Sequence, residues 1–485
     1  MTERNGASRT AASHRLHRVG VRHVALGVAL LLSGAGRLAG AQRAELESFI
    51  QRRVLANGLE VIVVENRGVP LVTLEAVVKN GSFTQTAETQ GLAHLYEHMF
   101  FKANEDHPRP DGVMNRAAGL GAVFNAETHE EKVNYYLTIP ADSLESGMRL
   151  LASALQRPMF LPQELAAEKV VVLGEYDRAE SEPFWHLSQA MDRALWREAF
   201  PQKNVIGQRA VLSNVTPEQM REIQSRYYVP NNTALIIAGD VSPTDAFARA
   251  ERILGPWPRG ADPFAAHPVP PVPPLPRDTA LIVEQDVRSV VVMLQWHGPS
   301  VGADPAATFT ADVFSDYLNL DGSAFTTRLV DSGLWQGVLV NYYTLNQVGP
   351  ITVSGQTTPE KLREAIPALM RELQRVTQPG YFTADKLREV TAKRGTDSAF
   401  GRERTSGFAR TLGFWWSVAG LEYYLDYNDE MARQTPDDLV RYARTYLLGK
   451  PHVTGVMLDP TTRATLDLSA DELRRLASWP AGATR

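Results

Sequence analysis

The 485-residue chain contains no cysteine, and beyond its first residues it has no long hydrophobic run. The absence of cysteine excludes a disulfide framework, thiolate ligands to a metal and lipid attachment through an N-terminal Cys. The most apolar segment, residues 24–32, is much shorter than the roughly 20 residues that cross a bilayer. We therefore expect no stable membrane span.

That apolar segment belongs to an N-terminal leader. Ala39-Gly-Ala41 before Gln42 is typical of an A-x-A cleavage site. The sequence predicts a signal peptide over residues 1–41 and an exported protein, periplasmic or secreted. An uncleaved N-terminal anchor is the alternative. The basic residues that precede the apolar segment are Arg4, Arg9, Arg15, Arg18 and Arg22.

An excess of positive charge is also missing. The leader holds six Arg and one Glu, so the rest of the chain carries 44 Lys and Arg against 54 Asp and Glu. A surface with this balance gives no reason to expect binding to nucleic acid or to anionic lipid.

Proline is concentrated in one segment, which marks a boundary. Such a density of proline excludes a helix or a central strand and predicts an extended, semi-rigid tether. We place this linker at residues 256–278. It separates an N-terminal domain, residues 42–255, from a C-terminal domain, residues 279–470, and a tail follows at residues 471–485.

The two halves repeat one another. The segment that begins at Phe160 has a counterpart at Phe382, and Thr216-Pro-Glu-Gln is answered by Thr435-Pro-Asp-Asp. Strands alternate with longer helical patterns in both halves. The predicted fold class is α+β, with two homologous domains of helices on a mixed sheet that face each other across the linker. Each copy ends in an apolar strand, at residues 233–239 and 453–458.

The motif that carries chemistry is His94-Leu95-Tyr96-Glu97-His98. On a helix, residues four apart project from one face, so the two imidazoles can grip one metal ion. Glu97 lies on the flank of that face, where it could take a proton from a metal-activated water. A lone H-x-x-E-H could also be a polar surface helix, so its setting must decide.

A catalytic zinc usually takes three protein ligands, so one more is needed. Residues 164–177 have helical periodicity and contain Glu168 and Glu175, which lie two turns apart on one face. One carboxylate can bind the metal while the other steers a ligand or a water. The alternative for Glu168, which precedes Lys169, is an ordinary solvated glutamate on a helix surface.

These residues resemble the signature of the pitrilysin/insulinase family of zinc peptidases, in its inverted H-x-x-E-H form. Glu175 follows His98 by 77 positions, and residues 121–128 with 134–140 are similar to the family's strand pair beside the zinc. The resemblance runs from about Val54 to about Pro460.

The resemblance implies a role for each of these positions. It makes His94, His98 and Glu175 the ligands of one Zn²⁺ per chain. It makes Glu97 the general base and Glu168 a carboxylate that assists catalysis from beside the ligands. Asn125 and Ala126 would lie on the edge strand that receives a peptide substrate.

Only the first copy keeps these residues. Alignment at Phe160 and Phe382 places Asp316 opposite His94 and Asp397 opposite Glu175, and residues 311–319 contain no His. The second half should therefore form a partner surface or a wall over the cleft of the first. A tryptophan pair, Trp415-Trp416, should fill core.

The family's non-metal half often supplies an Arg-Tyr pair for the scissile carbonyl. Here Val330 or Asp331 occupies the Arg position, and Trp335 or Gln336 the Tyr position. The departure suggests a dimer, possible forms being a homodimer or a heterodimer with a related subunit that supplies the Arg-Tyr pair.

The sequence thus predicts a zinc-dependent metalloendopeptidase that hydrolyses peptides or unfolded segments. Two alternatives from other classes remain open. One is a non-catalytic scaffold or assembly subunit, and the other is a protein that binds peptides without cleaving them.

Overall fold

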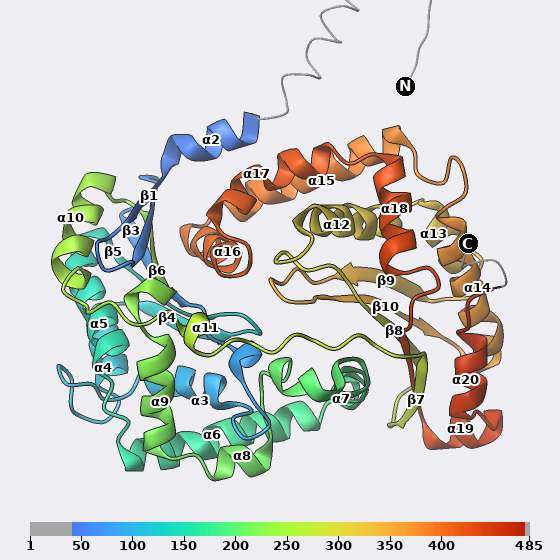
Figure 1. Cartoon of the computed structure of the whole chain (residues 1–485), viewed down its shortest axis with the longest axis horizontal. Coiled ribbons are helices and arrows are strands. Elements are labelled where there is room, and N and C mark those ends of the chain that lie inside the picture. Colours follow the sequence, from blue (N-terminus) through green and yellow to red (C-terminus); the bar gives the residue numbers. More distant parts are fainter. Residues whose placement is uncertain (1–40, 481–485) are drawn as a thin grey trace, which may run out of the picture.

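The computed structural model describes residues 41–480 (Figure 1). The predicted signal peptide lies outside the described residues except for Ala41, and so does the end of the predicted tail, residues 481–485. Within residues 41–480, no helix is both long enough and apolar enough to cross a membrane.

The first half is a six-stranded sheet with helices against it. The strand order is β1-β2-β6-β3-β5-β4, in which β2 and β6 are parallel and the other neighbours antiparallel. Strand β4 therefore lies at one edge. The strands are β1 (Ile50–Val54), β2 (Glu60–Glu65), β3 (Leu71–Val78), β4 (Val123–Thr128), β5 (Val133–Pro140) and β6 (Thr233–Gly239). The helices are α2 (Ala41–Phe49), α3 (Leu92–Phe100), α4 (Gly112–Gly119), α5 (Leu144–Gln156), α6 (Pro162–Glu180), α7 (Pro183–Trp196), α8 (Arg209–Ser213), α9 (Pro217–Tyr227) and α10 (Pro243–Leu254).

The second half repeats this plan with a five-stranded sheet, in the order β7-β11-β8-β10-β9. Strands β7 and β11 are parallel, and β9 lies at an edge as β4 does. The strands are β7 (Thr279–Glu284), β8 (Val290–His297), β9 (Gly337–Tyr342), β10 (Pro350–Thr357) and β11 (Val453–Leu458). The helices are α12 (Pro305–Asn319), α13 (Ala324–Thr326), α14 (Leu362–Arg375), α15 (Ala384–Gly401), α16 (Thr405–Val418), α17 (Leu421–Ala432), α18 (Pro436–Tyr446), α19 (Pro460–Leu466) and α20 (Ala470–Leu476).

The predicted α+β fold with two repeated mixed-sheet domains is confirmed. The repeat extends to local detail, because α9 and α18 begin in the same way. Thr216 and Thr435 each accept a hydrogen bond from a backbone N–H in the first turn, and Gln219 and Asp438 reciprocate. These capping boxes, each followed by Pro at the first helical position, fix where both helices begin.

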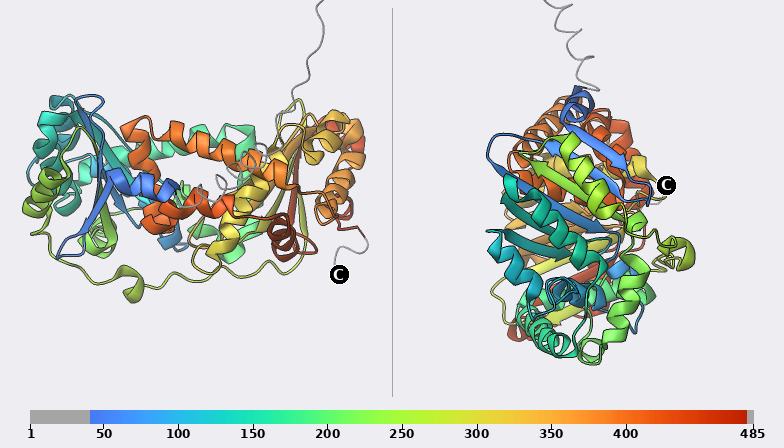
Figure 2. Two further views of the ribbon diagram at one scale, coloured as in Figure 1. Left: turned by 90° about the horizontal axis from the view of Figure 1, so that it is seen from above. Right: turned by 90° about the vertical axis from the view of Figure 1, so that its left-hand side faces the viewer.

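The two halves exchange helices across the molecule. Helix α16, from the second half, packs on β3 and β6 of the first sheet, and α7, from the first half, packs on β7, β8 and β11 of the second. Figure 2 shows helices of both halves lying between the two sheets. The apolar face that each sheet turns away from its own helices is therefore covered by a helix of the other half.

Alternation along β3 explains why the first sheet needs such a cover. Leu74 and Ala76 point into the core of the first half, while Val77 belongs to a separate cluster with Leu412 and Trp416 of the second half. Successive side chains of a strand point to opposite faces, so a central strand with both faces apolar requires a layer on each side. Of the Trp415-Trp416 pair, Trp416 is buried in this core under the first sheet, whereas Trp415 is half-buried.

The linker was expected to contain no helix, and this expectation is wrong at one point. Residues Pro263–Ala266 form a short helix, α11, in which the Asp262 side chain accepts hydrogen bonds from two backbone N–H groups. Proline is tolerated at the first position of a helix, because the N–H that it lacks has no partner there. The remainder is extended and runs along one face of the molecule (Figure 2).

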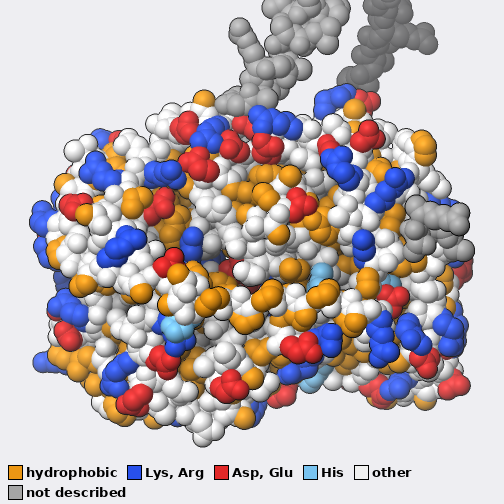
Figure 3. Space-filling view, viewed as in Figure 1, with side chains coloured by type: hydrophobic (Ala, Val, Ile, Leu, Met, Phe, Trp, Pro, Cys, Tyr) orange, Lys and Arg blue, Asp and Glu red, His pale blue; other side chains and the backbone are white. Residues whose placement is uncertain are grey.

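The surface around the linker mixes both signs of charge. In Figure 3, hydrophobic side chains form a band across the middle of the visible face, at the height where the linker crosses in Figure 1. Lys, Arg, Asp and Glu are interspersed above and below that band.

Helix α20 crosses the predicted boundary between C-terminal domain and tail, and Leu473 and Ala477 are buried in the core of the second half.

Candidate metal centre

Helix α3 presents the H-x-x-E-H motif from a fixed starting point. It begins after Gly91, whose backbone is left-handed with φ of 89°, and a Cβ there would lie 2.9 Å from the Cα of Gly207. Only glycine meets both demands without strain. Leu95 and Met99 of the helix are buried in the core of the first half. His94 and His98 are consequently directed toward α6.

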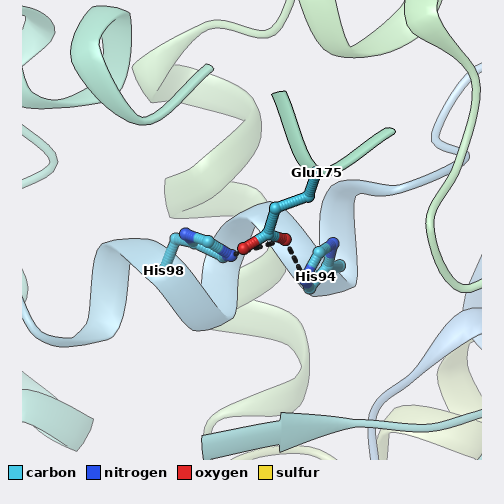
Figure 4. A group of neighbouring side chains, drawn as sticks. All are labelled: His94, His98 and Glu175. Atoms are coloured by element: carbon cyan, nitrogen blue, oxygen red, sulfur yellow. Dashed lines mark ion pairs between the residues drawn. The ribbon is translucent and has the colours of Figure 1, made fainter. Parts of the chain in front are cut away.

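Glu175 of α6 completes a group of three. Its Oε2 lies 3.5 Å from His94 Nε2 and 3.6 Å from His98 Nε2. In Figure 4 the carboxylate points between the two imidazoles, which come from neighbouring turns of α3. One ligand atom from each residue lies within 4.8 Å of the others. Two nitrogens and one oxygen at this spacing suit a tetrahedral zinc ion with a fourth position left open.

Glu168 lies behind His98. Its Oε2 is 3.0 Å from His98 Nδ1, and its Oε1 accepts from Lys102 Nζ at 2.7 Å. With Nδ1 held by this carboxylate, His98 presents Nε2 to Glu175. A ligand histidine typically donates its other N–H to such a group, which fixes the ring orientation and the tautomer.

The two histidines have different electrostatic environments. Burial, with a smaller contribution from the neighbouring His98, lowers the pKa of His94 to about 4, so His94 is neutral at pH 7. Burial also acts to lower the pKa of His98, but the hydrogen bond to Glu168 and the charges of Glu175 and Glu97 outweigh it and raise the value. Proton and metal therefore compete mainly for His98.

Glu97 leans toward the edge strand. Its Oε2 accepts a hydrogen bond of 2.6 Å from the Thr128 hydroxyl, at the end of β4. Burial raises the pKa of Glu97, against the opposing effects of Thr128 and His98. A carboxylate with a raised pKa holds a proton more readily, which suits a group that accepts and releases one.

Strand β4 offers one free edge. It pairs with β5 alone, and Asn125 is exposed whereas Ala126 is 7% exposed. In the turn between β4 and β5, His129 N donates to Lys132 O at 2.9 Å, so these two residues form a hydrogen-bonded pair. Along an antiparallel ladder, hydrogen-bonded pairs alternate with pairs that are not hydrogen-bonded. The pair of Ala126 with Tyr135 is therefore not hydrogen-bonded, so the N–H and C=O of Ala126 point to the free edge.

The corresponding place in the second half holds an ion pair. Arg394 Nη2 of α15 lies 2.7 Å from Asp316 Oδ2 of α12, and Asp397 pairs with Lys393 on the exposed side. Among residues 41–480, His94, His98 and Glu175 are the one group found with metal-ligand spacing. Of the two residues at the expected Tyr position, Trp335 is 2% exposed and so cannot reach a substrate, whereas Gln336 is exposed.

Sequence reasoning missed three side chains around this centre. Thr128 and Lys102 hold Glu97 and Glu168, and Arg410 of α16 donates to Glu127 of β4 at 2.8 Å. Lys102 follows His98 by four positions, a spacing that could have placed it on the same face. No sequence signal connects Arg410 with β4, because the two are joined only by the exchange of helices.

The duplicated fold, with a His-His-Glu group in one half only of the described chain, is that of a peptidase-like class of proteins. Residues 60–208 match the family model described as Insulinase (Peptidase family M16), and residues 214–393 match the one described as Peptidase M16 inactive domain. This chain belongs to the insulinase family, as the resemblance predicted.

Curated relatives include proteins named as zinc proteases. An uncharacterized zinc protease of Rickettsia felis is 26% identical over 200 residues, which are 41% of this chain and 48% of the relative. The mitochondrial-processing peptidase subunit beta of Dictyostelium discoideum is 24% identical over 188 residues, 39% of this chain and 40% of that protein. The matched region thus spans about half the length of these relatives, or less.

Solved structures share the whole fold. The first half of the periplasmic protease PqqL from Escherichia coli aligns with a TM-score of 0.72 and 20% identity, over 88% of this chain and 96% of that one. The complete PqqL aligns with a TM-score of 0.71 and 20% identity, over 88% of this chain and 49% of that one. In fold, this chain corresponds to one half of the longer protein.

Proposed function

We propose that this chain is a zinc-dependent metalloendopeptidase. The observation that carries the proposal is the convergence of His94 Nε2, His98 Nε2 and a Glu175 carboxylate oxygen within 4.8 Å. Two relatives' names, "Uncharacterized zinc protease" of Rickettsia felis and "Probable zinc protease PqqL" of Escherichia coli, support the choice of metal and reaction. Neutral His94 and the fixed tautomer of His98 fit a zinc ion.

Each residue of the centre has a distinct part in the proposed reaction. When bound, zinc supplies a Lewis acid that polarises a carbonyl and makes water acidic enough to lose a proton near neutral pH. Glu97 accepts that proton and delivers it to the amine that leaves. Thr128 holds the Glu97 carboxylate in position. Glu168 acts as a positioning residue through His98, and is in that sense part of the catalytic group.

The substrate would bind as an extra strand at β4. The backbone N–H and C=O of Ala126 face the free edge, and Asn125 lies beside them on the exposed face. Main-chain hydrogen bonds give affinity with little demand on sequence, and exposed side chains beside them add selectivity. We infer that extended peptides and unfolded segments are the substrate class.

Metal analysis and a quenched peptide substrate test this proposal on the purified chain from residue 42. We expect about one zinc per chain, as the group of three ligands His94, His98 and Glu175 predicts. Glu97→Gln should keep the zinc and lose about a hundred- to ten-thousand-fold in hydrolysis, the usual contribution of a general base. Glu180→Gln, at the far end of α6, is the control.

The outcome also separates the alternatives. Zinc with peptide binding but no cleavage indicates a capture protein. No zinc and no peptide binding indicates a scaffold subunit, and would end the proposal.

We further propose that the active form is a dimer in an exported compartment. In fold the chain spans half of PqqL, a protein that its structure title calls periplasmic, and one relative is named a subunit. Neither buried Trp335 nor exposed Gln336, the two residues at the expected Tyr position, is a tyrosine that could hold the substrate carbonyl. Loss of one such donor costs about a hundred- to a thousand-fold in rate, which a partner's Arg-Tyr pair would restore.

The dimer is tested by mass in solution and by mixing. We expect peptidase activity to rise steeply when a related Arg-Tyr subunit is added. Full activity of a monomer at high dilution would contradict the dimer but leave the zinc peptidase intact.

A further inference from the structure

The edge strand of the second half, β9, has the same form as β4. Both have six residues, and both pair on one side only. The fourth residue of each, Ala126 and Val340, is buried, and the third is exposed, with Leu339 at 54%. An exposed edge of this kind is a ready template for another strand.

The turn between β9 and β10 shows which residues of β9 are hydrogen-bonded to β10. Tyr343 N donates to Pro350 O at 3.2 Å, so these two residues form a hydrogen-bonded pair, and from there hydrogen-bonded pairs alternate with pairs that are not hydrogen-bonded. Val340 and Val353 consequently form a pair without hydrogen bonds. The N–H and C=O of Val340 point to the free edge, as those of Ala126 do in β4.

In β9 these two backbone groups are taken. Val340 N donates to Asn319 Oδ1 at 2.9 Å, and Asn319 Nδ2 donates to Val340 O at 2.6 Å. One primary amide therefore makes the pair of hydrogen bonds that a residue of an added strand would make. Its donor and acceptor match the backbone acceptor and donor.

Asn319 stands where the first half has Glu97. The alignment that pairs Asp316 with His94 pairs Asn319 with Glu97. A carboxylate has no donor for a backbone C=O, and Glu97 instead accepts from the Thr128 hydroxyl. The same position thus carries an acid at the edge that is open and an amide at the edge that is closed.

We propose that Asn319 closes β9 to extended peptides by occupying the backbone groups that a substrate strand would use, so that only β4 accepts one. The inference rests on the proposed binding of peptides at β4. It assigns Asn319 a role in specificity: it keeps substrate away from a half that has Asp316 and Arg394 in place of a metal site.

Site-specific cross-linking tests this directly, because the chain has no native cysteine. Leu339→Cys in β9 or Val123→Cys in β4 is labelled with a thiol-reactive photo-cross-linker, in the full chain with Glu97→Gln to prevent cleavage. Both side chains are exposed, at 54% and 70%. An extended model peptide with a fluorophore is the probe.

With Asn319 present, we expect cross-linking at position 123 and little at position 339. Asn319→Ala should raise the yield at 339 by about tenfold or more, since two backbone hydrogen-bonding groups become available. Asn319→Asp, which keeps the acceptor but lacks the donor, should give an intermediate yield. Asn341→Ala is the matched control, because it removes an exposed amide from the same strand and leaves the two hydrogen bonds between Asn319 and Val340 in place.

Each result has one reading. The inference is overturned if a folded Asn319→Ala chain still labels at 123 but labels at 339 no more than the chain with Asn319 does. No labelling at 123 together with a gain at 339 contradicts peptide binding at β4 but supports closure by Asn319. No labelling at either strand in the Asn319→Ala chain overturns both. Circular dichroism checks the fold of each variant.

Discussion

Glu168 is the residue whose replacement separates metal binding from folding. Its two carboxylate oxygens contact His98 and Lys102, whereas Leu165 and Val172 anchor the same helix, α6, in the core of the first half. We expect Glu168→Ala to weaken zinc binding by about ten- to a hundred-fold, the usual effect of losing a partner of a metal ligand. Competition with a chromogenic chelator measures this.

The control for that experiment is Glu180→Gln on the same helix, which should leave zinc affinity unchanged. A similar loss in both variants would indicate damage to α6 rather than a role for Glu168. An unchanged affinity in Glu168→Ala would remove the positioning role.

Asp312 gives the second half a pH-dependent stability. Burial raises its pKa to about 6, against the opposing charge of Arg394 and a hydrogen bond from Tyr427. A pKa above the ordinary value means that the folded state binds the proton more tightly, so stability is highest at low pH and is lost as pH rises through about 6. This raised pKa corresponds to about 2 to 3 kcal/mol of stability.

Asp312→Asn should abolish this pH-dependent contribution to stability. We expect the free energy of unfolding in urea of the parent, relative to that of the variant, to fall by about 2 kcal/mol between pH 4 and 6.5. Identical slopes for parent and variant would show that Asp312 does not titrate in this window.

At this scale the sequence predicts what local spacing controls. His94 and His98 follow from helical geometry, and the resemblance supplies Glu175. Thr128 and Asn319 could not be found, because each acts on a partner that only the packing of a helix against an edge strand brings near. A hydroxyl or an amide has no distinctive pattern before that contact exists.

At the scale of elements, Gly413 sets how closely α16 approaches the first sheet. A Cβ at this position would lie 2.7 Å from Val77 Cγ2 and 2.8 Å from Glu75 Oε1. We expect Gly413→Ala to lower the free energy of unfolding by about 1 to 3 kcal/mol, because the crowded interface must separate. Thermal or urea unfolding measures the change.

Gly395→Ala on α15 is the matched control. No atom lies within 4 Å of a Cβ built there, so alanine should instead stabilise by up to about 1 kcal/mol through helix propensity. The same sign in both variants would contradict the close packing of α16.

The sequence predicted the bounds of some strands but could not show which sheet each helix covers. Strands β6 and β11 have the predicted bounds, residues 233–239 and 453–458, since apolar runs between turns define them. An apolar face on α7 or α16 indicates that the helix packs against something, but it does not indicate which sheet the helix packs against. Their exchange depends on the arrangement of both halves together.

At the scale of the molecule, the linker should be dispensable once the chain has folded. We expect a chain cut at a protease site inserted between Ala266 and His267, both exposed, to elute from a sizing column at its original volume. Helices α7 and α16 still hold the two fragments together. Elution as two separate fragments would show that the exchange is too weak to replace the covalent connection.

The exchange of helices also determines how this gene can be divided. A product that ends at the linker retains α7 without its sheet and leaves Ile62, Val77 and Ile236 without the cover that Leu412 and Trp416 provide. Apolar surface of this kind promotes aggregation. Either half expressed by itself should accumulate in inclusion bodies, whereas co-expression of both from separate reading frames should yield a soluble complex.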